Sequence, residues 1–197
     1  GTGLRFVVLN DFHHDDEQCD PWMRALFAQV AQTERAAFCF GLGDLANAGK
    51  RQSLLSMRTH AKRLGMPFYV TPGNHDLDES PIDGYFSEVF PDRLNYTFTQ
   101  GGWQFVVVDT SDGNKWKDVV ISEQTLAWLD QTLPTLDPTL PTEHAQGRMT
   151  MTTNVCVARV RGNHDGTEFK GYWVCDARPD GTLSREFVPF VGPETVG

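Results

Sequence analysis

The sequence predicts an α/β fold built around parallel strands. Apolar runs at 4–9, 38–42 and 68–70 have the length and composition of buried strands. The two intervals between these runs each hold one helix-like stretch, which suits strand–helix–strand units of roughly 30 residues. Strands joined in this way run parallel, so their carboxyl ends meet at one edge of the sheet. The chain has 197 residues, enough for one such domain with a sizeable core.

Helix signals fill the intervals between the three strands. Asp20 and Pro21 are typical of a helix start, because Asp caps the first turn and Pro fits the first helical position. Gly65 and Pro67 mark the end of the second helix. The expected order is a strand at 4–9, a helix from 20 to about 33, a strand at 37–42, a helix at 54–64 and a strand at 67–71.

The second half of the chain has a different rhythm. Gly101 and Gly102 separate two strand-like runs at 95–99 and 103–109, which indicates a hairpin. Ser122 is a suitable cap for a helix that runs to about 133, and three prolines after it forbid regular structure. Three more strands are expected at 154–160, 171–176 and 184–188, the last two joined by a turn at 180–181.

Charge and composition exclude several classes of protein. The net charge of −9 disfavours a broad grip on nucleic acid or on an anionic membrane, so no nucleic-acid partner is expected. No run approaches the ~18 apolar residues of a membrane span, which predicts a soluble protein. Nothing at the start resembles a signal peptide, and the first residue is not Met. The compartment therefore stays open between the cytoplasm and export after removal of a leader, and so does the oligomeric state.

The four cysteines do not form a metal-binding pattern. None of them shows the C-x-x-C spacing of a zinc finger, and Cys39 is expected to be a small core residue within its strand. A disulfide among the others stays open.

Polar motifs follow each of the three strands. They are Asp11-Phe12-His13, Gly43-Asp44 and Gly73-Asn74-His75-Asp76. Each motif alone would be no more than a turn or a helix cap. Three of them in order, one helix apart, are expected to meet at the carboxyl edge of the sheet. Their oxygen and nitrogen donors suit Mn, Fe or Zn better than Ca or a thiolate-bound zinc.

These motifs resemble those of the calcineurin-like metallophosphoesterases, also called metallo-dependent phosphatases. The family carries D-x-H, then G-D, then G-N-H-[D/E], in the order found here, and the resemblance extends from residue 4 to about 133. It implies a four-layer α/β/β/α sandwich in which two mixed sheets lie face to face, formed by residues 1–197 as one domain. The resemblance also implies two divalent or trivalent transition metal ions.

The resemblance assigns a role to most of the motif residues. Asp11 and His13 would bind the first metal ion, Asp44 would bridge the two ions, and Asn74 would bind the second. His75 would act as the catalytic group at the leaving oxygen. From its position in the motif, Asp76 is expected to orient the His75 ring, as a carboxylate often does for a catalytic histidine.

The chemistry that follows is hydrolysis of a small phosphomonoester or phosphodiester by a metal-bound hydroxide. The alternative is a degenerate protein of the same fold that binds metal or phosphate but is catalytically weak or inactive.

The sequence departs from the family pattern after residue 133. The family supplies further histidine ligands from two later motifs, one of them Gly-His-x-His, and none of the six histidines here lies in that pattern. The 15 residues from 134 to 148 are too few for the missing strands and their crossover. Either the printed sequence skips residues near 141–146, or the protein is naturally shortened. We favour the first, because a core without two strands would expose two sheet edges.

Three further residues are candidates for substrate contact. His14 follows the first motif directly and would line the pocket or cap the next helix. Asn163 and His164 belong to a second Gly-Asn-His-Asp stretch, which would lie at the mouth of the site or form an ordinary polar turn. Asn47 is expected to support its loop, and His60 to be structural or exposed.

Overall fold

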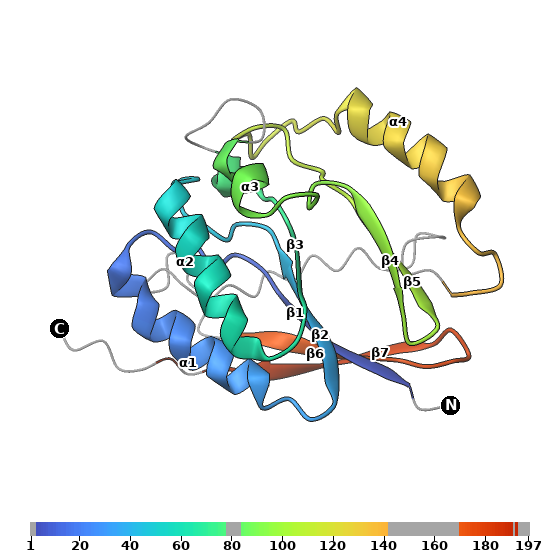
Figure 1. The fold of residues 1–197 in the computed structure, drawn as a ribbon, viewed down its shortest axis with the longest axis horizontal. Coiled ribbons are helices and arrows are strands. Elements are labelled where there is room, and N and C mark those ends of the chain that lie inside the picture. The colour runs from blue at the N-terminus through green and yellow to red at the C-terminus, as the bar shows by residue number, and fades with distance from the viewer. Residues whose placement is uncertain (1–2, 78–83, 142–169, 191, 193–197) are drawn as a thin grey trace.

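The computed structural model describes residues 3–77, 84–141, 170–190 and 192. Its main feature is a five-stranded mixed sheet with the strand order β3-β2-β1-β6-β7 (Figure 1). The strands are β1 (Leu4–Leu9), β2 (Ala36–Leu42), β3 (Phe68–Thr71), β6 (Gly171–Ala177) and β7 (Leu183–Pro189). β1, β2 and β3 are parallel neighbours, whereas β6 and β7 add to the sheet in antiparallel fashion. The expected parallel strands are therefore confirmed.

Helices connect the parallel strands as expected. The α-helices are α1 (Asp20–Ala31), α2 (Arg51–Ala61), α3 (Gly84–Val89) and α4 (Glu123–Thr132). The described residues also form four 3₁₀ turns, namely η1 (Glu17–Cys19), η2 (Lys62–Leu64), η3 (Asn74–Leu77) and η4 (Leu133–Thr135). α1 and α2 cover one face of the sheet (Figure 1). At the start of α4, the Thr125 N–H donates to Ser122 Oγ. The helix cap expected at Ser122 is thus confirmed.

Alternation along β1 divides the core into two layers. Val7 and Leu9 point toward α1 and α2 and belong to the larger cluster of buried side chains. Phe6 and Val8 point to the opposite face, which packs against the second sheet. This alternation follows from the two-residue period of a strand, and it explains why β1 is apolar on both faces from Phe6 to Leu9.

The second sheet is a hairpin of β4 (Tyr96–Gln100) and β5 (Trp103–Val107). Aromatic rings fill the space between the two sheets. Phe38 of β2 stacks on Phe6 with 4.9 Å between ring centroids, and it meets Phe105 of β5 edge-on at 5.2 Å. α4 lies beyond the hairpin, on the side away from α1 and α2 (Figure 1). The expected order of helix, sheet, sheet and helix is therefore confirmed, with two strands described in the second sheet.

Some expectations differ from the structure or lie outside the described residues. α3 was not expected, because a helix of six residues is too short to show a clear period in the sequence. The expected strand at 154–160 and the join near 141–146 lie outside the described residues, apart from Pro141 itself. Cys19, Cys39 and Cys175 are buried, and Cys156 lies outside the described residues.

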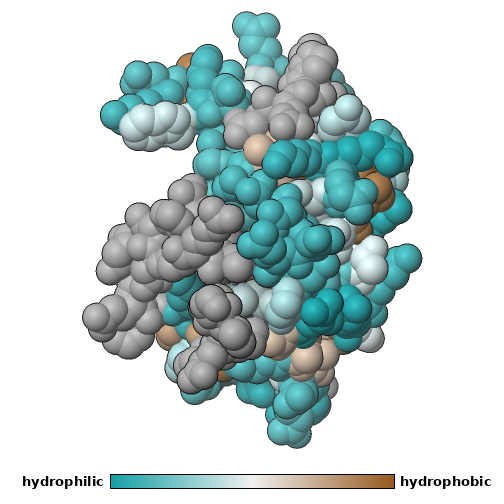
Figure 2. Space-filling view, turned by 90° about the vertical axis from the view of Figure 1, so that its left-hand side faces the viewer, coloured by the Kyte–Doolittle hydropathy of each residue, from teal (hydrophilic) through white to brown (hydrophobic). Residues whose placement is uncertain are grey.

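On the face in Figure 2, the described residues are mainly hydrophilic and the hydrophobic ones form small separate patches. No helix among the described residues has both the length and the apolar character needed to cross a membrane.

Candidate metal centre

The loops after β1, β2 and β3 are tied together by hydrogen bonds. The backbone N–H of Asp11 donates to the Gly43 carbonyl at 3.0 Å, and that of His13 donates to the Asp44 carbonyl at 2.9 Å. The backbone N–H of His75 donates to Asp44 Oδ1 at 3.0 Å. The second loop therefore bonds to both of the others, and the three sequence motifs meet at one edge of the sheet.

Unusual backbone angles bring these side chains together. Asp11, His13 and Asp44 all have positive φ values, of 57°, 49° and 51°. Non-glycine residues rarely adopt this left-handed conformation, and they concentrate at functional sites. Gly73 allows the third loop to approach, since a Cβ atom at this position would lie 2.1 Å from Asp44 Oδ1.

The side chains of the first two motifs surround a common point. His13 Nε2 lies 3.5 Å from Asp11 Oδ1 and 3.7 Å from Asp44 Oδ2. These distances exceed an ordinary hydrogen bond. They match the roughly 3.4 Å between two donor atoms that each lie about 2.1 Å from one ion in tetrahedral geometry. His13, Asp44 and His75 each offer a ligand atom, and these atoms all lie within 4.8 Å of one another.

Burial and charge favour a cation at this point. His13 is buried, and its Nδ1 has no hydrogen-bond partner among the described residues. Burial raises the pKa of the Asp44 carboxyl, and the nearby Asp11 carboxylate also raises it, although His13 and the His75 N–H act in the opposite direction. Two carboxylates beside a buried imidazole form an unfavourable arrangement that a metal ion would relieve. The donor set therefore fits the metal ions that the sequence predicts.

His75 is held with one ring nitrogen fixed. Its Nδ1 lies 2.7 Å from the carbonyl oxygen of Asn47. A carbonyl oxygen only accepts hydrogen bonds, so Nδ1 carries a proton and donates. The other nitrogen, Nε2, then carries a lone pair in the neutral ring and can be a ligand, and it acts as a proton donor only when the ring is the imidazolium. Asn74 is the residue before His75 at the start of η3, next to the backbone bond that His75 makes to Asp44.

The expected role of Asp76 is wrong. Its carboxylate does not orient the His75 ring but accepts from the backbone N–H groups of Ala46, at 2.7 Å, and Gly73, at 2.9 Å. The side chain is fully buried, and burial raises the pKa of Asp76 to about 7 although both N–H groups favour the ionised form. Asp76 therefore joins the second and third loops, and Asn47 orients the His75 ring.

The structure does not favour the substrate contact expected of His14. This side chain is 2% exposed, and its Nε2 lies 3.0 Å from Asp20 Oδ1. His60 is also buried and contacts the same oxygen, so of the two alternatives expected for it, structural or exposed, the structure shows the first. Asn163 and His164 lie outside the described residues, so their placement at the mouth of the site stays a prediction.

Sequence reasoning missed one polar neighbour of the site. Asn10 is buried, and its amide donates to the Asp11 carboxylate. Asn is seldom buried, so an Asn directly after an apolar strand was the sequence feature that could have indicated this contact.

Comparison with known proteins agrees with this geometry. Residues 4–140 match the family described as calcineurin-like phosphoesterase. The chain belongs to the calcineurin-like phosphoesterases. All three strand-end motifs lie within the matched residues, which confirms the resemblance drawn from them. No curated protein matches the chain.

Several solved structures are similar to this calcineurin-like phosphoesterase. Purple acid phosphatase PPD1 from yellow lupin (Lupinus luteus) seeds has a TM-score of 0.46 and 15% identity, over 70% of this chain and 28% of its own. Phosphopantetheinyl hydrolase (PptH) from Mycobacterium tuberculosis has a TM-score of 0.42 and 16% identity, over 72% of this chain and 67% of its own. Vps29 from Chaetomium thermophilum has a TM-score of 0.37 and 14% identity, over 96% of this chain and 98% of its own. The chain thus spans under a third of the lupin protein.

Proposed function

We propose that this chain hydrolyses phosphate esters, either small phosphomonoesters or phosphodiesters, with the aid of transition metal ions. The observation that carries this proposal is the approach of His13 Nε2 to carboxylate oxygens of Asp11, at 3.5 Å, and of Asp44, at 3.7 Å, at the carboxyl edge of the sheet. Membership of the calcineurin-like phosphoesterases supports the same reaction class.

The strand-end residues would divide between two ions of Mn, Fe or Zn. Asp11 and His13 would hold the first ion, Asn74 the second, and Asp44 both, because a carboxylate has two oxygens to offer. Bound ions supply positive charge to the phosphate and lower the pKa of water. Asp76 supports this set through its bonds to Ala46 and Gly73, which keep the second and third loops in register.

His75 would donate a proton to the leaving oxygen. Its Nδ1 is committed to the Asn47 carbonyl, so the ring presents Nε2 in a fixed orientation. A positioned general acid contributes about 10²- to 10⁴-fold to a rate. The net charge of −9 disfavours nucleic acid as the substrate, although bound metal ions would still attract a single phosphate group.

The alternative is a protein that binds metal or phosphate without turnover. The observation that favours it is the absence of a Gly-His-x-His stretch from the sequence. The second ion then lacks the histidines that the family supplies. Asn163 and His164 remain candidates for substrate contact in either case.

Turnover of nitrophenyl phosphates with defined metal ions separates the two functions. We expect the protein to bind about two ions per chain and to hydrolyse 4-nitrophenyl phosphate or bis(4-nitrophenyl) phosphate, with all activity lost in EDTA. The Asp44→Asn variant should lose both metal and activity. The His75→Asn variant should keep its metal and lose at least about 100-fold in kcat.

Glu88→Gln is the matched control, because Glu88 is exposed and pairs only with Arg51 among the described contacts of its carboxylate. It should behave as wild type. Metal binding without turnover of either ester would support the alternative, and a protein that binds neither Mn, Fe nor Zn would exclude the proposed centre.

A further inference from the structure

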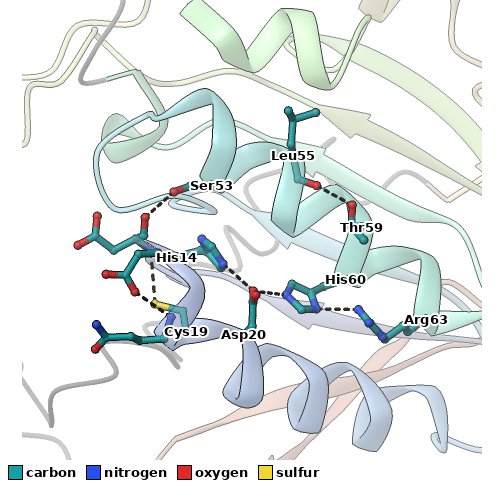
Figure 3. A network of polar contacts seen from close by, with 11 residues as sticks. His14, Cys19, Asp20, Ser53, Leu55, Thr59, His60 and Arg63 are labelled. Carbon is teal, nitrogen blue, oxygen red and sulfur yellow. Dashed lines mark hydrogen bonds and ion pairs between the residues drawn. The ribbon is translucent and has the colours of Figure 1, made fainter.

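A second polar cluster lies behind the metal-binding loop. Asp20, at the start of α1, accepts from two buried histidines at one carboxylate oxygen (Figure 3). His14 Nε2 lies 3.0 Å from Asp20 Oδ1, and His60 Nε2, from α2, lies 2.7 Å from it. The cluster thus joins the loop after β1 to both helices that cover the sheet.

The protons in this cluster can be assigned. Arg63 lies 2.9 Å from His60 Nδ1, and because a guanidinium only donates, Nδ1 must accept. The proton of neutral His60 is therefore on Nε2, which donates to Asp20. Burial lowers the pKa of His60 despite its contact with Asp20, which favours the neutral form of the ring. The Nε2 proton of His60 is thus directed at Asp20, and this contact is satisfied as a hydrogen bond without a metal ion.

His14 fits the same assignment. Its Nδ1 is buried without a partner among the described residues, so its proton also belongs on Nε2, facing Asp20. Partial burial would by itself raise the pKa of Asp20, but the hydrogen bonds from His60 and His14 hold it below its ordinary value. Two hydrogen bonds to one carboxylate oxygen favour the ionised form of Asp20.

The cluster holds the loop that carries the first metal ligands. His14 follows His13 directly, its backbone N–H donates to the Leu45 carbonyl at 3.0 Å, and its carbonyl accepts from the Asn47 N–H at 2.9 Å. The next residue, Asp15, accepts from Ser53 Oγ through its carbonyl at 2.8 Å (Figure 3). The loop is therefore fixed from behind by α1 and α2 and from the side by the loop after β2.

Such support is needed because the loop is strained. Asp11 and His13 both have left-handed backbone angles. Conformations of this kind persist only where the surroundings hold them in place. Without the Asp20 oxygen, two buried imidazole N–H groups would lose their acceptor, and the loop would gain freedom to relax.

We propose that Asp20 is a positioning residue that holds the first metal-binding loop through His14 and His60. The inference rests on the proposed function for the metal itself, whereas the holding of the loop is a property of the metal-free protein. The two can therefore be tested separately.

The first test measures amide hydrogen exchange in the metal-free protein. In Asp20→Ala, the amides of Asp11, His13 and His14 should exchange about tenfold faster or more, because two hydrogen bonds to a charged group are lost. Asp20→Asn keeps an acceptor oxygen of the same shape and should restore part of the protection. Amides of β2 and of the middle of α1 should not change.

The second test measures binding of Mn and Co ions by titration, with the Co absorption spectrum as the report of ligand geometry. Both Asp20 variants should bind about 10- to 100-fold more weakly than wild type, as is typical when support for a ligand is removed. Thr59→Ala is the control, since Thr59 lies on the exposed side of α2 and bonds only to the Leu55 carbonyl in Figure 3.

The outcomes are distinct. Unchanged loop exchange in Asp20→Ala would overturn the inference, and so would loop and α1 amides that accelerate equally, since that result means fraying of the helix. Wild-type metal affinity in the folded variants would also overturn it. An extra ion per chain that disappears in Asp20→Ala would show that the cluster is a ligand set, contrary to the inference. Absence of metal from wild type would instead contradict the proposed function.

Discussion

Asp176 of β6 and Arg5 of β1 form a two-point ion pair across neighbouring strands. Arg5 Nε donates to Asp176 Oδ1 at 2.8 Å, and Arg5 Nη2 donates to Oδ2 at 2.9 Å. The hydrogen bond from Arg5 lowers the pKa of the Asp176 carboxyl below its ordinary value of 3.8. A carboxyl whose pKa is lower in the folded protein than in the unfolded chain stabilises the fold at pH values above the unfolded-state pKa. This stabilisation is lost as the pH falls through the folded-state value.

We therefore expect Asp176→Asn to lower the free energy of unfolding at pH 7 but not at pH 2. Both side chains are partly exposed, so the loss at pH 7 should stay within about 1 kcal/mol. Urea denaturation of both proteins at the two pH values measures this loss in the free energy of unfolding. Asp130→Asn, which removes an exposed carboxylate from α4, serves as the control. A loss of equal size at both pH values would show that the ion pair is not its cause.

At the residue scale, the sequence predicted which side chains could donate ligands to a metal ion and the edge of the sheet at which they would lie. Asp11, His13 and Asp44 follow strand-like runs, and parallel strands bring such ends together. The role of Asp76 was not predictable in this way. Its partners are backbone N–H groups at Ala46 and Gly73, and backbone groups leave no mark in the sequence.

At the scale of elements, β2 carries the contact between the two sheets. Phe38 is fully buried, stacks on Phe6 of β1, and meets rings of both strands of the second sheet. Truncation to Ala would leave a cavity between two sheets that backbone pairing keeps from closing. We expect Phe38→Ala to lower the free energy of unfolding by about 3–5 kcal/mol, measured by urea denaturation.

A matched control for this prediction is Val120→Ala, at a position that is 68% exposed. Its effect should stay within about 0.5 kcal/mol. If Phe38→Ala were as mild as this control, the second sheet would not be packed on β2 in solution.

Elements were easier to predict than the contacts between them. The strand at Leu4–Leu9 has the predicted bounds, and α2 begins three residues before the expected start, because its first turn is polar. The cluster at Asp20 was not predictable. Its three residues come from a loop and two helices, with no fixed spacing, so only the folded chain brings them together.

At the scale of the whole molecule, the second sheet has fewer described strands than the first. It has two described strands, against five in the first sheet. α4 beyond it has Thr125 as its one buried residue, and Leu126 is 47% exposed. The Pro141 carbonyl accepts from the Gln104 N–H of β5, so Pro141 lies beside the second sheet. Residues inserted after Pro141 would therefore begin beside the second sheet, where they could add strands to it.

We accordingly keep the prediction that the natural protein contains residues near 141–146 that the printed sequence skips, including further histidines. Trypsin cleaves after Lys117 and Arg148, so the printed sequence requires one peptide of residues 118–148. We expect mass spectrometry of the protein from its natural source to lack this peptide and to show instead a fragment that begins at Asp118 and departs from the printed sequence after Pro141. A control peptide at 94–115, which follows Arg93 and ends at Lys115, should appear as printed. Detection of the intact 118–148 peptide would mean that the chain is naturally shortened. In that case the second metal ion would lack the family's histidines, and the alternative of a weak or inactive binding protein would gain its strongest support.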